Sequence, residues 1–170
     1  MKALFLDRDG IINIDKKYVH KIKDFIFVDG IFELCELFLK KGYKIFVITN
    51  QSGIARGYYT QKDFEILSSF MLEEFEKKGI KIEKIYYCPH LEACECRKPK
   101  PKMLFDARDE FKLNLEQSVF IGDNISDMQA GKNAGLKELY LINEKEQEGN
   151  FYTKFKTLKD LISFLLKENK

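Results

Sequence analysis

Short apolar segments rich in β-branched residues alternate with segments of helical periodicity along this chain. Strands are expected at residues 2–6, 44–49, 83–87, 118–121 and 138–141. Helices are expected at residues 31–41, 60–78, 102–111, 126–133 and 157–167. The alternation predicts an α/β fold of three layers (α/β/α), with a parallel sheet between two layers of helices. Ligands of such sheets bind at the carboxyl ends of the strands, so a functional site is expected there.

Length and charge narrow the possible classes of protein. The 170 residues favour a single domain over residues 1–170. Lys and Arg number 29 against 27 Asp and Glu, a net charge of +2, which argues against binding nucleic acid through bulk charge. The apolar runs are far shorter than the roughly 18 residues of a membrane span, and no signal peptide is visible. We therefore expect a cytoplasmic monomer without a membrane or nucleic-acid partner.

Two carboxylates follow the first expected strand, in the sequence Asp7-Arg8-Asp9-Gly10. Carboxylates at a buried strand end lose hydration and repel each other unless a cation lies between them. Mg²⁺ prefers such oxygen ligands. The pattern favours a magnesium site, and taken alone it also fits an aspartate-rich turn that bends at Gly10.

Polar residues follow the second and fourth expected strands as well. Hydroxyl and amide side chains that can hold a phosphate follow the second strand: Thr49, Asn50, Gln51 and Ser52. The fourth strand is followed by Asp123, which can complete a metal site, and by Asn124. Asp127 comes one helical turn later, where it can support the metal site or act as a helix-start residue.

A basic pair follows the third expected strand and its loop. Lys98 can neutralise carboxylates and a phosphate, and Arg97 can bind a phosphate through two parallel hydrogen bonds. In a chain with 33% charged residues, such a pair alone also fits a solvated surface. Successive strand ends thus carry a carboxylate pair, a hydroxyl, a lysine and a carboxylate. This combination favours phosphate chemistry.

The four motifs, in this order, resemble those of the haloacid dehalogenase-like (HAD) phosphohydrolases: Asp7 with Asp9, then Thr49, then Lys98, then residues 122–127. The resemblance covers nearly the whole chain and implies a Rossmann-like HAD core. It implies that Asp7 attacks phosphorus to form an aspartyl-phosphate, and that Asp9 protonates the leaving group and then activates water. Thr49 and Lys98 would hold the phosphoryl oxygens. Mg²⁺ would be held by Asp7, Asp9 (through its backbone carbonyl) and Asp123.

Other segments are similar to the D-glycero-D-manno-heptose 1,7-bisphosphate 7-phosphatases within that superfamily: residues 18–30, 49–56 (TNQSGIAR), 86–90 (YYCPH) and 96–99 (CRKP). The similarity implies hydrolysis of a sugar 7-phosphate in nucleotide-activated heptose biosynthesis, as for lipopolysaccharide. It implies substrate contacts by Asp15, Lys16, Lys17, Tyr18, Asn50, Gln51, Ser52, Arg97 and Asn124. Two positions depart from the pattern: Ile11 stands where Thr is usual, and Asn124 where a basic residue is frequent.

The loop after the third strand carries a C-x-H-x₃-C-x-C pattern: Cys88, His90, Cys94 and Cys96. Three sulfurs and one imidazole suit tetrahedral Zn²⁺, and four protein ligands leave no open position, so a structural zinc is expected in residues 88–96. Reduced thiols in a loop are the alternative. Related enzymes usually have more residues between the two ligand pairs. Zinc here would fix the base of the loop that delivers Arg97 and Lys98.

Other functions share part of this pattern. Histidinol-phosphate phosphatases have the same aspartates and the Cys/His loop, and they are the alternative among enzymes. A phospho-accepting signalling domain also combines an acidic pocket, a Thr and a Lys, but the Cys/His loop has no place in it. A zinc-loop interaction module would leave the aspartates without a role. The connections are too short for a large cap domain, so we expect an open site for a small sugar phosphate.

Overall fold

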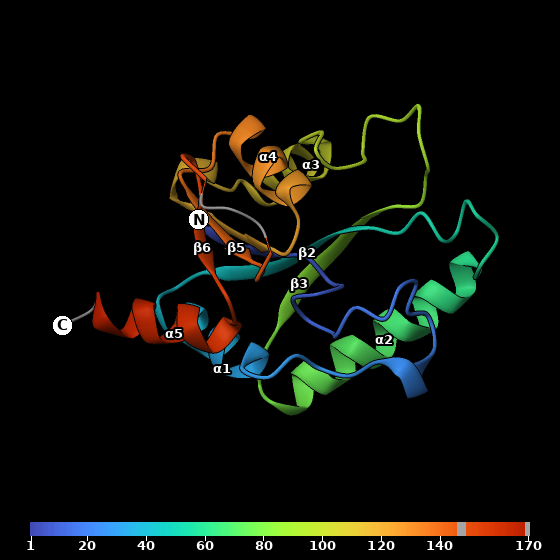
Figure 1. Ribbon diagram of the computed structural model, residues 1–170, viewed down its shortest axis with the longest axis horizontal. Coiled ribbons are helices and arrows are strands. Elements are labelled where there is room, and N and C mark those ends of the chain that lie inside the picture. The colour runs from blue at the N-terminus through green and yellow to red at the C-terminus, as the bar shows by residue number, and fades with distance from the viewer. Residues whose placement is uncertain (146–148, 169–170) are drawn as a thin grey trace.

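The computed structural model describes residues 1–145 and 149–168, and in these residues six strands form one sheet in the order β3-β2-β1-β4-β5-β6 (Figure 1). Every neighbouring pair of strands is parallel. The strands are β1 (Ala3–Leu6), β2 (Lys44–Asn50), β3 (Ile82–Cys88), β4 (Val119–Gly122), β5 (Glu138–Ile142) and β6 (Thr153–Phe155). The helices are α1 (Ile31–Lys40), α2 (Gln61–Lys77), α3 (Lys102–Phe111), α4 (Ile125–Asn133) and α5 (Leu158–Lys167). Short 3₁₀ turns lie at Ile22–Asp24 and Leu115–Gln117.

The helices cover both faces of the sheet, so the predicted three layers are confirmed (Figure 1). Successive side chains of a strand point to opposite faces, and each face therefore has its own core. Leu4 and Leu6 of β1 belong to the core formed with α1, α2 and α5, whereas Phe5 belongs to the core formed with α3 and α4. Burial on both faces explains why the central strands are continuous apolar runs in the sequence.

The predicted helices and the five predicted strands are present, with ends that differ by one residue at most. Thr60 precedes α2 in a capping box with Asp63, and Thr157 with Asp160 forms another before α5. Strand β6 was not predicted, because three residues give too little alternation to recognise.

The segment 13–30 joins β1 to α1 as a loop, and no large cap domain is present in the described residues. Backbone hydrogen bonds tie the segment together, from Ile14 to Ile26 (2.8 Å) and from Val28 to Ile12 (2.9 Å). Phe25 contacts Phe70 of α2 with ring centroids 6.0 Å apart. The segment therefore packs against α2 and borders the carboxyl end of the sheet (Figure 1). None of the described helices is both long and apolar enough to cross a membrane.

Candidate active site

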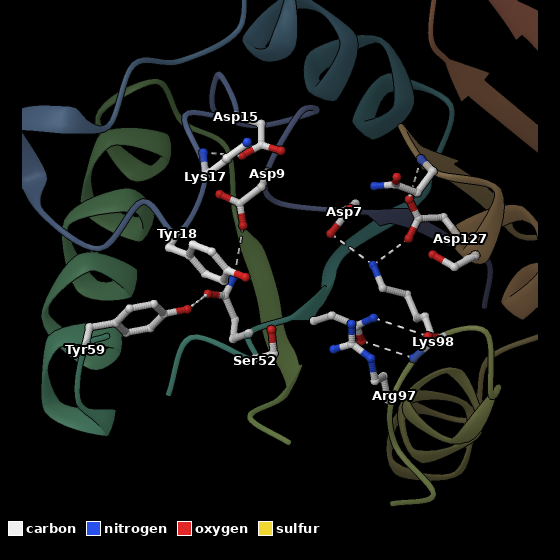
Figure 2. A pocket seen from close by; sticks show the side chains of 14 residues that line it. Asp7, Asp9, Asp15, Lys17, Tyr18, Ser52, Tyr59, Arg97, Lys98 and Asp127 are labelled. Atoms are coloured by element: carbon white, nitrogen blue, oxygen red, sulfur yellow. Dashed lines mark hydrogen bonds and ion pairs between the residues drawn. The ribbon is translucent and has the colours of Figure 1, made fainter. Parts of the chain in front are cut away.

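A pocket of about 550 Å³ opens where β1, β2 and β4 end, beside the loop that follows β3 (Figure 2). Most of the residues predicted for catalysis or substrate binding line it: Asp7, Asp9, Asp15, Lys17, Tyr18, Asn50, Gln51, Ser52, Arg97, Lys98 and Asn124. Asp127 lines it too, together with Tyr59 and Ser126, which the sequence did not predict. Three predicted residues are not among the lining side chains: Lys16, Thr49 and Asp123.

Lys98 lies between two carboxylates at the bottom of this site (Figure 2). Its Nζ is 3.0 Å from Asp7 Oδ1 and 2.6 Å from Asp127 Oδ1, and it donates to the backbone oxygen of Ile48 (2.9 Å). Burial acts to lower the pKa of Lys98, but Asp127 and Asp7 outweigh it and hold that pKa above its ordinary value. Burial and then the neighbouring Asp127 raise the pKa of Asp7 well above its usual range. The lysine therefore offsets only part of the negative charge collected here.

Asp7, Asp123 and Asp127 each offer a carboxylate oxygen within 4.8 Å of the others. Two glycines make room for them, because a Cβ on Gly10 would lie 2.0 Å from Asp123 Oδ2 and one on Gly122 would lie 2.4 Å from Asp127. Burial and then Asp127 raise the pKa of Asp123 to about 7. Three carboxylates that a single lysine does not balance suit a divalent cation with oxygen ligands. The residues therefore fit the expected Mg²⁺, and the Asp127 carboxylate belongs to the same cluster as those of Asp7 and Asp123.

Mg²⁺ is expected to stabilise the protein more at pH 8 than at pH 5.5. The pKa of Asp123 is about 7 in the fold against an ordinary 3.8, so the fold favours the protonated carboxyl group. The stability that this protonated group contributes is lost as the pH rises through about 7. A metal ion binds the deprotonated carboxylate and restores that stability where the proton has left. Thermal melts with and without Mg²⁺ at both pH values measure this, with Asp123→Asn as the variant that should lose most of the gain. An equal shift in melting temperature at both pH values would contradict it.

The Asp9 side chain lies outside the cluster of Asp7, Asp123 and Asp127, and it accepts hydrogen bonds from three donors. Its Oδ1 accepts from Arg8 Nη2 (2.9 Å) and Asn13 Nδ2 (3.0 Å), and its Oδ2 accepts from Gln51 Nε2 (3.1 Å). Arg8 is buried and also donates to the backbone oxygen of Val19 (2.7 Å), so it links Asp9 to the segment 13–30. The side chain of Asp9 is therefore fixed at the edge of the pocket.

The polar residues at the end of β2 mainly bind other parts of the site. Asn50 exchanges two hydrogen bonds with the backbone of Lys98, at 3.3 Å to its oxygen and 3.1 Å from its nitrogen. The buried Thr49 Oγ1 accepts from Gln51 Nε2 (2.9 Å). The two bonds of Asn50 join the end of β2 to the loop after β3, and they position Lys98 next to Asp7.

The rim of the pocket carries the other predicted substrate-binding residues. Lys17 and Tyr18 have positive φ angles of 60° and 53°, and this turn brings them to one side of the pocket, with Arg97 on another (Figure 2). Tyr18 packs edge-to-face on Tyr58, with ring centroids 4.8 Å apart. Asn124 donates to Asp123 Oδ1 (2.9 Å), so its amide is already bound within the site.

Cys88, His90, Cys94 and Cys96 lie together in the loop after β3, with their ligand atoms within 4.8 Å of one another. Cys88 Sγ is 3.5 Å from Cys94 Sγ and 2.9 Å from Cys96 Sγ, and His90 Nδ1 is 3.2 Å from Cys96 Sγ. A tetrahedral zinc with Zn–S bonds of about 2.3 Å would hold its sulfurs about 3.8 Å apart. Ala93 has a φ of 53°, and this left-handed turn lets so short a loop close. The four side chains thus fit a closed zinc site.

Cys96→Ser is expected to lower the zinc content and to reduce turnover about 10- to 100-fold, as loss of a positioning contact does at metal sites. Cys96 is two residues from Lys98, so a loose loop misplaces the lysine beside Asp7. Metal analysis and Mg²⁺-dependent phosphate release measure both effects. Cys35→Ala, in the core, is the matched control and should keep its zinc. A folded, zinc-free protein with unchanged turnover would contradict the prediction.

A known protein family matches most of this chain. The sequence profile described as "Haloacid dehalogenase-like hydrolase" matches residues 7–140. The chain belongs to the haloacid dehalogenase-like hydrolase family. The resemblance predicted from the four motifs is thereby confirmed.

Two relatives within this family are similar over nearly their whole length. A D-glycero-alpha-D-manno-heptose-1,7-bisphosphate 7-phosphatase of Campylobacter jejuni is 63% identical over 96% of this chain and 95% of its own. A D-glycero-beta-D-manno-heptose-1,7-bisphosphate 7-phosphatase of Helicobacter pylori is 49% identical over 96% of this chain and 97% of its own. The more specific resemblance predicted from the sequence is therefore confirmed as well.

A solved structure supports the HAD fold. It is a D,D-heptose 1,7-bisphosphate phosphatase from B. bronchiseptica, complexed with magnesium and phosphate. It superposes with a TM-score of 0.88 at 26% identity, over 99% of both chains. The predicted HAD core without a large cap domain is confirmed.

Proposed function

We propose that this HAD hydrolase is a Mg²⁺-dependent phosphomonoesterase that removes the 7-phosphate of D-glycero-D-manno-heptose 1,7-bisphosphate. The observation that carries the proposal is the buried Asp7, which lies between Lys98 and the other carboxylates at the bottom of the pocket, with Asp9 at its edge. The names of the relatives supply the sugar. The reaction would belong to nucleotide-activated heptose biosynthesis.

The proposed reaction has two half-reactions. In the first, a carboxylate oxygen of Asp7 attacks phosphorus, the bond to the sugar oxygen breaks, and Asp9 gives its proton to that oxygen. In the second, Asp9 takes a proton from water, the water oxygen attacks phosphorus, and phosphate leaves Asp7. Lys98 and Thr49 hold the phosphoryl oxygens, each contributing about 3 kcal/mol to the transition state. Asp7, Asp123 and the backbone carbonyl of Asp9 would hold Mg²⁺, which would supply positive charge against the negative charge of the phosphoryl group.

Recognition of the sugar is assigned to the rim. The cationic side chains of Lys17 and Arg97 on different sides of the open pocket suit a substrate with a second phosphate. Asp15, Tyr18 and Ser52, which also line the pocket, complete the proposed set. Lys16 is not among the lining residues, and the amides of Asn50, Gln51 and Asn124 are already bound within the protein. The α anomer is favoured, because the relative named for it is the more similar of the two compared above.

Phosphate release by the purified protein with Mg²⁺ tests this function. Both anomers of the heptose bisphosphate and histidinol phosphate are compared at equal concentration. We expect one phosphate released per heptose bisphosphate, a preference for the α anomer, and little release from histidinol phosphate. A preference for histidinol phosphate would reject the proposed substrate and keep the hydrolytic mechanism.

Arg97→Ala is expected to lose substrate discrimination and to keep the chemistry. The kcat/KM for the heptose bisphosphate should fall about 10- to 100-fold, the size of a lost charge-assisted pair of about 1.5–3 kcal/mol. An aryl phosphate without a second anion should lose little. Arg108→Ala is the control, because Arg108 lies on α3 and pairs with Asp109. Equal losses for both substrates would show that Arg97 does not select the sugar.

The structural zinc, the single domain, the monomeric state and the cytoplasmic location complete the proposal. Size-exclusion chromatography with light scattering tests the monomer, with an expected mass near the 20.0 kDa of the chain.

A further inference from the structure

We propose that Tyr59 is a positioning residue that holds the Gln51 amide in the orientation needed to direct Asp9 for proton transfer. Tyr59 lines the pocket, and its hydroxyl donates to Gln51 Oε1. The inference rests on the proposed phosphatase activity, and it assigns a residue and an acceptor atom that the motifs do not supply.

The hydrogen bonds of Asp9 leave one of its two oxygens with an open lone-pair position. An ionised carboxylate has about four lone-pair positions, two on each oxygen. Arg8 and Asn13 occupy both positions on Oδ1, whereas Gln51 occupies one on Oδ2. The remaining position on Oδ2 is therefore the one at which Asp9 can hold and transfer a proton.

The Gln51 amide has a partner for each of its polar groups. Nε2 donates its two hydrogens to Asp9 Oδ2 (3.1 Å) and to Thr49 Oγ1 (2.9 Å), and Oε1 accepts from Tyr59. In Figure 2 the dashed lines from Tyr59 and from Asp9 meet at this amide. The Thr49 hydroxyl accepts from Gln51, and its own hydrogen makes only a long 3.5 Å contact with the backbone oxygen of Asn50, which a phosphoryl oxygen can replace. One amide thus orients both Asp9 and Thr49.

The amide needs a partner at its oxygen because Asp9 changes protonation in each turnover. An unheld amide can turn Oε1 toward protonated Asp9 and accept the proton that the leaving group requires. The Tyr59 hydroxyl occupies Oε1 and opposes that turn. Burial raises the pKa of Tyr59 to about 12, so the hydroxyl keeps its hydrogen at working pH.

Tyr59 itself is held rigidly. Its side chain is buried, with 5% of the residue exposed, and its ring stacks on His20 with centroids 5.1 Å apart and an angle of 10° between the planes. His20 belongs to the segment 13–30, which Arg8 also links to Asp9. The same segment therefore supports Asp9 from two sides.

Tyr59→Phe tests the proposal through its dependence on the leaving group. For a sugar phosphate, whose alkoxide must be protonated as it leaves, kcat/KM is expected to fall about 10-fold or more. For p-nitrophenyl phosphate, whose phenolate leaves without a proton, kcat/KM should change less than about twofold. A purely structural defect lowers both together and would overturn the proposal. Tyr58→Phe is the matched control, because Tyr58 is exposed and its ring contact with Tyr18 is kept.

A double-mutant cycle shows whether Tyr59 acts through Gln51. Gln51→Met keeps the length of the side chain and removes both hydrogen-bonding groups. It should lower kcat/KM for the sugar phosphate at least as much as Tyr59→Phe does, and it should also lower kcat/KM for p-nitrophenyl phosphate, because Thr49 loses its donor. Adding Tyr59→Phe to Gln51→Met should then cost nothing further. A full additional loss would mean that Tyr59 contacts the substrate directly, and would overturn the proposal. If the wild type hydrolyses no phosphomonoester, the proposed function fails; if it does so and Tyr59→Phe leaves both substrates unchanged, only this inference fails.

Discussion

Replacing Asp7 by Asn is expected to abolish turnover while the fold stays at least as stable as the wild type. Loss of the nucleophile in a covalent mechanism lowers kcat by about 10⁴-fold or more. Burial and then Asp127 raise the pKa of Asp7, so the fold disfavours its ionised form. A carboxyl group whose pKa is raised by folding makes the fold less stable as the pH rises and the group ionises. A neutral amide does not ionise, so it avoids this loss of stability. The gain should therefore appear at pH 7 and disappear near pH 3.

Turnover of the heptose bisphosphate and thermal melting in the absence of Mg²⁺ are the two measurements. Asp106→Asn on α3 is the matched control, because its carboxylate is exposed and pairs only with Lys102 among the described residues. Residual turnover above about 1% of wild type would reject Asp7 as the nucleophile, since another group would then form the covalent bond. A melting temperature well below that of the wild type would show that the bond to Lys98 outweighs the cost of burying the charge.

Replacing Lys98 by Met is expected to lower both stability and catalysis. Lys98 is 4% exposed and lies between Asp7 and Asp127, so its loss leaves two buried carboxylates without their cation. Removing one partner of a buried ion pair costs about 3–5 kcal/mol. A lost donor to the phosphoryl oxygens costs about 10²–10³ in kcat. The stability loss should be largest at pH 8 and shrink toward pH 5, because the carboxylates can then take up protons.

Denaturant unfolding at pH 5 and pH 8 measures the stability loss. Lys100→Met is the matched control, since Lys100 is half exposed and its ion pair with Glu95 is 3.5 Å long, a surface pair worth less than about 1 kcal/mol. An equal loss of stability at both pH values would mean that packing, and not charge, holds Lys98 in place.

The sequence predicted the strands and the residues at their ends because both are local features. A strand buried on two faces is a continuous apolar run, and polar residues at its carboxyl end mark where it leaves the sheet. Asp7, Thr49 and Asp123 could be placed in this way without knowing how the strands pair. The capping box of Thr60 and Asp63 is a local feature too, because its two residues are three positions apart.

Contacts between distant loops could not be predicted in this way. Asn50 binds the backbone of Lys98 and Gln51 binds Asp9, and these partners are 48 and 42 residues apart in the sequence. The sequence therefore suggested substrate contacts for two amides that the structure engages within the protein. Tyr59 has no motif of its own, and the turns between β2 and α2 bring its hydroxyl back to Gln51, eight residues earlier in the sequence.

The division between strand ends and connecting segments has an evolutionary consequence. The aspartates proposed to act on the phosphate follow β1 and β4, whereas the rim of the pocket comes from residues 13–30 and from the loop after β3. Substitutions in those surface segments leave the hydrogen bonds of the sheet intact. A gene duplicate of such a protein can therefore acquire a new sugar preference by loop mutation alone while it keeps the inherited hydrolytic chemistry.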